Sequence, residues 1–354
     1  MTFDPEQLAE HDLRPLRELL LDAGYRTETL AGHLRLHPEM LLADTARNSL
    51  IHGDSLGSSP SAVLGRLFLL CALVPVPEVR KLSSSLIQAL YGYNLVRADA
   101  AGRHVVGNVT ITEVDGFYYV ADRLFENTSG AVGVTISSDV CMPPHASSFE
   151  LAKAISVVSP DSSVLDVGCG SGCLSLPLTA SAGLVTGIDT SSRAVAFSRA
   201  NASCNGVTAR FEHVGWEKFD SPEQYDLILY NSPDERAAFE FVNDGLPRLL
   251  RHGGRAQVRL VCDIHAEDRD VQGAVRRMTN VGPQFDVRVL APDDSLFSLG
   301  RDVLAHGGRP ARTLLVERHS EWQAYVDSLR RRGVVEVASI ILDITRGRPG
   351  PSGQ

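Results

Sequence analysis

The sequence has no apolar run of about 20 residues, the length that a helix needs to cross a bilayer, so we expect no membrane-spanning segment. Its first residues, MTFDPEQLAEHD, are acidic and polar, and they lack the basic and apolar regions of a secretory signal. The six cysteines are scattered and form no CxxC pair, which argues against a zinc site or a disulfide framework. We therefore expect a reduced, cytoplasmic protein with no metal site.

Basic residues are also in short supply. The 354 residues include 34 Lys and Arg against 43 Asp and Glu, and the formal net charge is -9. Residues 1–150 carry 18 acidic and 11 basic residues, and residues 151–354 carry 25 and 23. Neither part has the positive excess that binding to a phosphate backbone requires, so nucleic acid is not an expected partner. The length fits two domains of roughly 100–200 residues each.

The first part of the chain reads as helices followed by a β-hairpin. Apolar spacing predicts helices over 5–23, 27–36, 60–73 and 78–91. The turn Asp115-Gly116 lies between two apolar runs and predicts a hairpin. This order predicts a mostly helical, winged-helix-like domain over residues 1–122. Because this part is acidic, we interpret it as a module for homodimer formation or for covering a substrate, and not as a DNA reader.

From residue 149 onward, strands and helices alternate. Candidate strands lie at 163–167, 184–188, 209–213, 226–230, 256–262, 285–290 and 336–345. Candidate helices lie at 149–157, 172–180, 192–204, 235–250, 267–279 and 320–331. This alternation is typical of an α/β fold with a doubly wound, mostly parallel sheet. We expect that domain over residues 149–354. The preceding connector, 123–148, is rich in Ser, Gly and Pro over 129–148, and linker and lid are both open interpretations.

A glycine-rich loop in the stretch VLDVGCGSGCLSL, residues 164–176, predicts a ligand site. An apolar strand ends at Asp166, and the glycines that follow are Gly168, Gly170 and Gly172. Glycines permit a tight strand-to-helix turn and let a ligand approach the bare backbone. The helix start then offers unpaired N–H groups to an anionic group. Asp189, 17 residues after Gly172, ends the next strand, where its carboxylate can accept hydrogen bonds from both hydroxyls of a ribose. Capping of the turn by Asp166 and of the next helix by Asp189 are the alternatives.

The pattern DxGxGxG resembles motif I of the class I S-adenosylmethionine (SAM)-dependent methyltransferases. A dinucleotide fingerprint, GxGxxG, would need glycine where this chain has Cys173. The resemblance covers about 141–346. It implies a seven-stranded Rossmann-like methyltransferase sheet, SAM as cofactor and S-adenosylhomocysteine as product. It also implies cofactor contacts from Asp166, Gly168, Gly170, Gly172 and Asp189. Trp216 stands where the family commonly has Asp or Ser, and both stacking on adenine and packing in the core are open.

A second motif follows the fourth predicted strand. The residues Asn231-Ser232-Pro233-Asp234 resemble the NPPY-type motif of amino-methyltransferases that act on glutamine amides, adenine and guanine. The resemblance implies that Asn231 contacts the cofactor and accepts a hydrogen bond from the acceptor nitrogen, with Ser232 and Pro233 beside the acceptor.

This chain departs from the motif, because Ser232 replaces the first proline and Asp234 replaces the aromatic residue that stacks on a planar acceptor. Asp234 and Glu235 instead add negative charge. We therefore expect an amine or guanidinium-like acceptor, with Asp234 as a candidate general base. Capping of the next helix by these acids is the alternative.

The stretch CMPPHASSFELAKAI, residues 141–155, resembles the proline-containing segment that closes over the methionine end of SAM in the same group. It adds Met142, Pro143 and His145 as candidate pocket residues, with a purely structural His145 as the alternative. The whole layout resembles actinobacterial methyltransferase-like proteins with an N-terminal winged-helix region.

The predicted function is SAM-dependent N-methylation of a small molecule. A methyltransferase for a protein, such as a release factor, or for RNA is the first alternative. An O-methyltransferase and a non-catalytic SAM-binding protein are the others.

Overall fold

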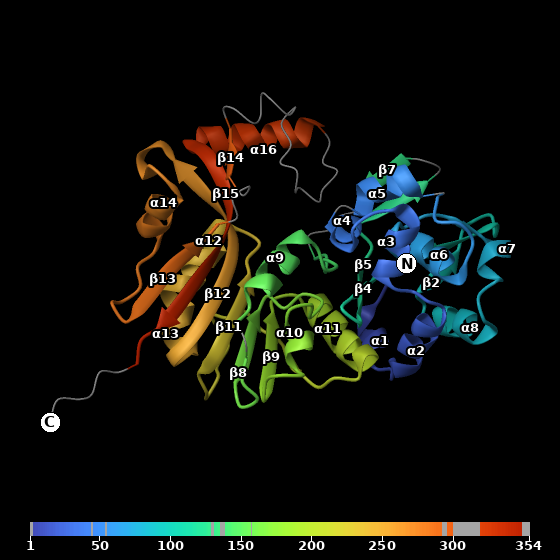
Figure 1. The fold of residues 1–354 in the computed structure, drawn as a ribbon, viewed down its shortest axis with the longest axis horizontal. Coiled ribbons are helices and arrows are strands. Elements are labelled where there is room, and N and C mark those ends of the chain that lie inside the picture. Colours follow the sequence, from blue (N-terminus) through green and yellow to red (C-terminus); the bar gives the residue numbers. More distant parts are fainter. Residues whose placement is uncertain are drawn as a thin grey trace.

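The computed structural model describes residues 3–43, 45–53, 55–128, 131–134, 139–156, 158–291, 296–299 and 319–348. Figure 1 shows a mostly helical N-terminal part on the right and an α/β part built around one large sheet on the left. Across the described residues, every helix is too short or too polar to span a membrane.

The N-terminal part contains eight short helices and a π-helical turn among its described residues. They are α1 (Pro5–Ala9), α2 (Arg14–Asp22), α3 (Thr27–Leu34), α4 (Pro38–Ala43), α5 (Thr45–His52), α6 (Pro60–Leu64), η1 (Gly65–Leu69), α7 (Val76–Val79) and α8 (Ser84–Gly92). Two predicted helices are interrupted. The predicted 5–23 helix is divided into α1 and α2. Pro15 lies in the first turn of α2, because a proline in the interior of one continuous helix would clash with the preceding turn. Ser83 starts α8 afresh, with its Oγ accepting from the Leu86 N–H at 3.2 Å.

Two small antiparallel sheets complete this part. The strands are β1 (Val74–Pro75), β2 (Val96–Ala98), β3 (His104–Gly107), β4 (Val109–Val114) and β5 (Phe117–Asp122). The first three form one sheet in the order β1-β3-β2, which the sequence patterns did not predict. The other two form the predicted hairpin, whose turn residues Asp115 (φ 50°) and Gly116 (φ 83°) are both left-handed. The winged-helix class of this part stays a prediction.

The connector contains a further hairpin of β6 (Phe125–Thr128) and β7 (Ala131–Val134). Residues 129–130 and 135–138, on which much of the lid interpretation depends, lie outside the described residues.

The α/β part is a mixed sheet in the order β10-β9-β8-β11-β12-β15-β13. Its strands are β8 (Ser163–Val167), β9 (Leu184–Asp189), β10 (Arg210–His213), β11 (Tyr225–Asn231), β12 (Leu250–His265), β13 (Phe285–Leu290) and β15 (Val334–Arg346). All seven predicted strands are present, and β15 runs antiparallel to both of its neighbours. An eighth strand, β14 (Leu296–Ser298), pairs with one end of β15.

Helices cover both faces of this sheet. They are α9 (Ala146–Ala154), α10 (Ser175–Leu178), α11 (Ser192–Asn205), α12 (Glu235–Glu240), η2 (Phe241–Gly245), α13 (Leu246–Leu249), η3 (Ala266–Asp268), α14 (Val271–Met278) and α16 (His319–Arg331). Alternate residues of β11 face opposite sides, as the period of a strand requires. Leu227 and Leu229 pack with α9 and α10, whereas Ile228 and Tyr230 pack with α12, η2 and α13. The fold is therefore the α/β arrangement that the sequence predicted.

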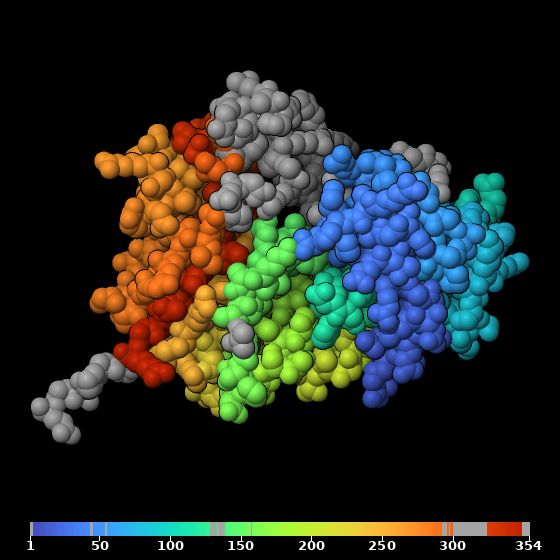
Figure 2. All heavy atoms as spheres, viewed as in Figure 1, coloured from blue at the N-terminus to red at the C-terminus, as the bar shows by residue number. Residues whose placement is uncertain are grey.

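The two parts share a continuous core. Phe197 and Cys204 of α11 are buried with the leucines of the N-terminal helices. Beside them, Arg193 of α11 binds Asp122 at the end of β5, with an Nε–Oδ2 distance of 2.8 Å. In Figure 2 the blue N-terminal surface lies directly against the yellow-green surface of this region. The N-terminal part is thus fixed to the helix that follows β9.

Candidate cofactor and acceptor site

The carboxyl ends of β8, β9 and β11 meet at a cavity of about 580 Å³. This is the position where open parallel sheets bind ligands. Ten residues singled out in the sequence line it: Met142, Pro143, His145, Gly168, Gly170, Asp189, Trp216, Asn231, Ser232 and Pro233. Four others do not, namely Asp166, Gly172, Asp234 and Glu235. The two motif regions and the segment before α9 therefore meet at one place.

Asp189 holds the glycine loop in shape. Its Oδ2 accepts from the Gly170 N–H at 3.0 Å, and its Oδ1 accepts from the Ser191 N–H at 2.9 Å. Ser191, and not Asp189, is the N-cap of α11. The Asp189 carboxylate lines the cavity and keeps lone pairs for further donors, such as ribose hydroxyls.

Gly170 presents bare backbone to the cavity. Its φ of 54° is left-handed, and a Cβ built there has no neighbour within 4 Å. A side chain would therefore project into the space that the cavity offers to a ligand. Nearby, the buried Ser171 also lines the cavity, and its Oγ interacts with the Cys173 thiol, which is a weak hydrogen-bonding group. A hydroxyl in this position can also bind a polar ligand. These features fit SAM.

Asp166 acts from behind the loop. It is buried, its Oδ2 accepts from the Ser175 Oγ at 2.5 Å, and its Oδ1 has no partner among the described residues. Chiefly through burial, the pKa of this carboxyl is raised to about 7; the hydrogen bond from the Ser175 hydroxyl opposes the shift, and the charge of Asp189 adds to it. The hydrogen bond between Asp166 and Ser175 therefore connects the end of β8 to the start of α10. Asp166 itself does not line the cavity, which is lined by neighbouring residues of the loop.

The acceptor side is formed by the end of β11. Asn231 is the last residue of that strand and pairs in register with Arg259 on β12. The Ser232 N–H donates to the Arg259 carbonyl at 2.9 Å, which holds the motif against β12. The Asn231 Nδ2 donates to the Ser147 Oγ at 2.9 Å. Sequence reasoning missed Ser147 and Arg259. The only available signal for Ser147 was a serine at the start of a predicted helix.

Asp234, the last residue of the motif, and Glu235, which follows it, lie outside the cavity lining. Asp234 is exposed and caps α12, with its Oδ1 accepting from the Ala237 N–H at 2.8 Å. The Glu235 Oε1 accepts from the Asp263 N–H at 2.8 Å, and burial raises the pKa of the Glu235 carboxyl. Neither carboxylate lines the cavity, where the charged side chain next to Asn231 is Arg259. The helix-capping alternative therefore describes Asp234, and the geometry gives a general base at this position no support.

Trp216 packs in the core and also lines the cavity, and its stacking on adenine stays a prediction. Its ring lines the cavity and also packs edge-on against Phe241, with ring centroids 5.6 Å apart and an interplanar angle of 76°. The core thus holds Trp216 at the edge of the cavity.

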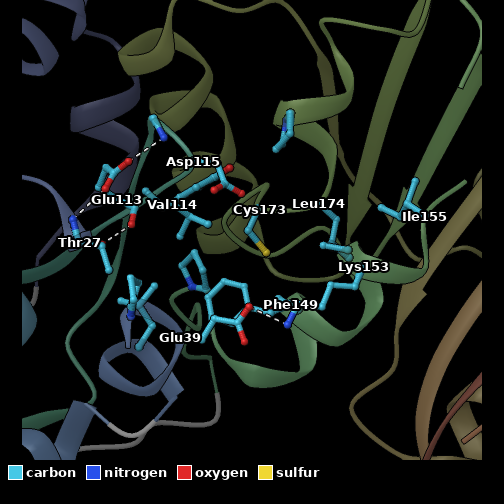
Figure 3. Close-up of a pocket in the computed structure, with 18 of the residues that line it drawn as sticks. Thr27, Glu39, Glu113, Val114, Asp115, Phe149, Lys153, Ile155, Cys173 and Leu174 are labelled. Carbon is cyan, nitrogen blue, oxygen red and sulfur yellow. Dashed lines mark hydrogen bonds and ion pairs between the residues drawn. The ribbon is translucent and has the colours of Figure 1, made fainter. Parts of the chain in front are cut away.

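A second cavity of about 860 Å³ lies between the N-terminal part and α9 and α10. Figure 3 shows its labelled walls, including Phe149 and Leu174, and the dashed contact between Lys153 and Glu39, whose Nζ–Oε1 distance is 2.6 Å. It shares Ser148, Cys173 and Leu174 with the first cavity. Sequence reasoning missed it, because segments that are distant in the chain form its walls.

Comparison with known proteins identifies the domain. Residues 159–288 match the family model described as "Methyltransferase domain". The chain is similar to the ubiquinone biosynthesis O-methyltransferase of Rhizobium leguminosarum bv. trifolii, at 33% identity over 26% of this chain and 37% of that protein. It is also similar to the release factor glutamine methyltransferase of Cereibacter sphaeroides, at 32% identity over 34% of this chain and 52% of that protein. The solved structure of P. horikoshii TYW2 in complex with MeSAdo has a TM-score of 0.45 at 16% identity, covering 86% of this chain and all of that one.

These matches confirm the predicted SAM-dependent methyltransferase domain, with SAM as its cofactor. The chain spans only about a third to a half of the two curated relatives. Their acceptors differ in kind, as their names show, so the domain identifies the cofactor and not the acceptor.

Proposed function

We propose that the protein is an enzyme that methylates a nitrogen atom of a small molecule, with SAM as the methyl donor. The observation that carries the acceptor atom is the orientation of Asn231. Its Nδ2 is engaged by Ser147 at 2.9 Å, which leaves its carbonyl oxygen for a donor in the cavity. A nitrogen nucleophile that carries an N–H is such a donor.

The residues of the chain bind and orient, and SAM supplies an electrophilic methyl group when bound. Asp189 and the glycine loop would hold the nucleoside and the polar end of the cofactor. Asn231 accepts the N–H of the acceptor and so directs its lone pair into the cavity. Holding two reactants in this way supplies much of the rate, because orientation is fixed before reaction.

The structure weakens the expectation of an amine or guanidinium-like acceptor. It depended on Asp234 and Glu235, whose carboxylates lie outside the cavity lining. Arg259 lines the cavity instead, with its Nε 3.6 Å from the Glu150 Oε2. We therefore propose an uncharged amine nitrogen as the nucleophile. Its proton leaves to solvent or buffer after transfer, and no base on α12 takes part.

The experiment uses SAM labelled on its methyl group with purified protein and a host extract. Protein, RNA and small molecules are then separated. Label in the small-molecule fraction, lost in Asn231→Ala, supports the proposal. Label in protein would instead favour a release-factor-like acceptor, the kind named for one of the similar proteins. If the labelled methyl group is found on an oxygen atom of the product, the acceptor atom is oxygen and not nitrogen. Absence of label from every fraction, with SAM binding intact, would favour a non-catalytic SAM-binding protein.

A further inference from the structure

A chain of hydrogen bonds connects the cap of α9 to the acceptor motif. His145 is the N-cap of α9, and its Nδ1 accepts from the Ser147 N–H at 3.3 Å. The same Nδ1 lies 3.1 Å from the Ser147 Oγ. The Ser147 Oγ in turn accepts from the Asn231 Nδ2 at 2.9 Å. Ser147 is buried and all three residues line the first cavity.

The direction of each bond follows from the donors available. Nδ1 accepts a backbone N–H, so it carries a lone pair and the ring proton is on Nε2. A serine hydroxyl has one proton, which the Ser147 Oγ therefore gives to Nδ1. Its oxygen is left to accept from Asn231, and only the NH₂ side of that amide can donate. The carbonyl Oδ1 of Asn231 is thereby placed on the side away from Ser147.

We propose that His145 and Ser147 are positioning residues, which fix the amide of Asn231 with its oxygen offered to the N–H of the methyl acceptor. This deepens the proposed function and rests on it in one respect, the role of Asn231 toward the acceptor. The relay itself is a property of the chain alone.

Protonation of His145 would reverse the relay. A proton on Nδ1 makes that atom a donor to the Ser147 Oγ. With its proton no longer taken by the ring, the Ser147 hydroxyl can donate to Asn231, and the amide then turns so that Oδ1 faces the serine and the NH₂ group faces the acceptor. Burial, together with the positive charge of Arg259 from β12, lowers the pKa of His145 to about 4. Glu150 from α9 lies against Arg259 at 3.6 Å and moderates that charge. The ring is therefore neutral at pH 7, and the relay reverses only as the pH falls toward 4.

Three variants separate positioning from mere structure. Ser147→Ala removes the relay but keeps the backbone N–H that His145 caps. Ser147→Thr keeps the hydroxyl. His145→Asn keeps an oxygen that can cap α9 and accept from Ser147, but it does not titrate. Ser83→Ala is the matched control, because it removes a capping hydroxyl from α8, far from the site.

The readouts are kcat and KM for labelled transfer to the small-molecule fraction, and the Kd for SAM by titration. Ser147→Ala should lower kcat by about 10- to 100-fold, as misorientation of a reacting group does. The Kd for SAM should change by less than about twofold, since the cofactor groups are untouched. Ser147→Thr should recover most of the rate. His145→Asn should keep the rate at pH 7 and lose the acid-side decline that we expect of wild type. Equal kcat in Ser147→Ala and wild type would overturn the proposal.

A measurement that needs no acceptor keeps this test separate from that of the proposed function. In ¹⁵N-histidine NMR of the full chain, the signal lost in His145→Asn identifies His145 among the 11 histidines. We expect an unprotonated Nδ1 throughout the range from pH 7 to pH 5, and a shift of that signal in Ser147→Ala. A protonated Nδ1 at pH 7 would overturn the relay. If wild type transfers no label but the NMR result holds, the proposed function fails and the relay stands.

Discussion

The Asp189 Oδ2 accepts a hydrogen bond from the Gly170 N–H at 3.0 Å, so the acid that ends β9 fixes the loop that follows β8. One carboxylate thus shapes the loop and also faces the cavity. Replacing Asp189 with Asn leaves a single acceptor oxygen and puts an NH₂ group where an acceptor is needed. We expect the affinity for SAM to fall by at least about tenfold, as loss of a charge-assisted bond does.

Isothermal titration with SAM and with S-adenosylhomocysteine measures this change. Asp286→Asn is the control, because Asp286 is an exposed acid on β13 whose ion pair, among the described residues, is with nearby Arg288. Unchanged affinity in Asp189→Asn would contradict a cofactor role for this carboxylate.

Gly170→Ala tests the bare backbone of the loop. At φ 54° an alanine costs about 1–2 kcal/mol in strain, and its Cβ would enter the cavity. Gly102→Ala provides the same strain in a turn far from the site, since Gly102 has φ 67° and its Cβ would also meet nothing within 4 Å. Both variants should lose similar stability in urea denaturation. Only Gly170→Ala should lose SAM affinity, and equal affinities would show that the cavity does not hold the cofactor at this point.

Local patterns predicted the parts of the molecule that local physics determines. The loop from Gly168 to Gly172 could be predicted because its turn needs a left-handed φ at each of these glycines, which glycine adopts readily. The strands could be predicted from their apolar runs. The sequence could not show that Asp234 caps a helix and does not face the cavity. Whether an acid after a strand faces a ligand or caps a helix depends on one backbone conformation, here φ -150° and ψ 163°. The relay through Ser147 and the second cavity depend on packing between distant segments, which no local pattern contains.

The contact between the two parts was equally invisible in the sequence, and it should contribute to stability. Asn201 of α11 binds the backbone of Val120 on β5 through both amide atoms, with the Val120 N–H donating at 2.7 Å and its carbonyl accepting at 2.9 Å. The Asn201 Nδ2 also donates to the Ser171 carbonyl at 2.9 Å, so Asn201→Ala leaves three buried backbone groups without this partner. We expect a loss of about 3–6 kcal/mol in the free energy of unfolding, from three groups at about 1–2 kcal/mol each. Urea denaturation measures the loss, with exposed Asn280→Ala as control. A loss below that of the control variant would mean that water replaces the side chain.

Because Asp166 is buried, the free energy of unfolding should fall as the pH rises from about 4 to about 7. Its folded-state pKa is raised from 3.8 to about 7, chiefly by burial, so the folded state binds a proton that the unfolded state has released between pH 4 and pH 7. Wild type should therefore lose stability as the pH rises through this window. In Asp166→Asn no proton is bound at this position, and its stability relative to wild type should increase from pH 4.5 to pH 7.5. Urea titrations at several pH values measure the difference, and a constant difference would show that Asp166 is ionised in the folded protein throughout.

Asp234 distinguishes capping from catalysis. As the N-cap of α12, its Oδ1 is engaged by the Ala237 N–H at 2.8 Å. Asparagine caps helices about as well as aspartate, whereas Asp234→Ala should cost about 1 kcal/mol of stability. Labelled methyl transfer by Asp234→Asn should therefore stay close to that of wild type across the pH range. A general base cannot be replaced by an amide, so a loss of most turnover in Asp234→Asn, with stability intact, would return this carboxylate to the reaction. Because capping and proton transfer need different atoms, measuring both variants for both properties decides between them.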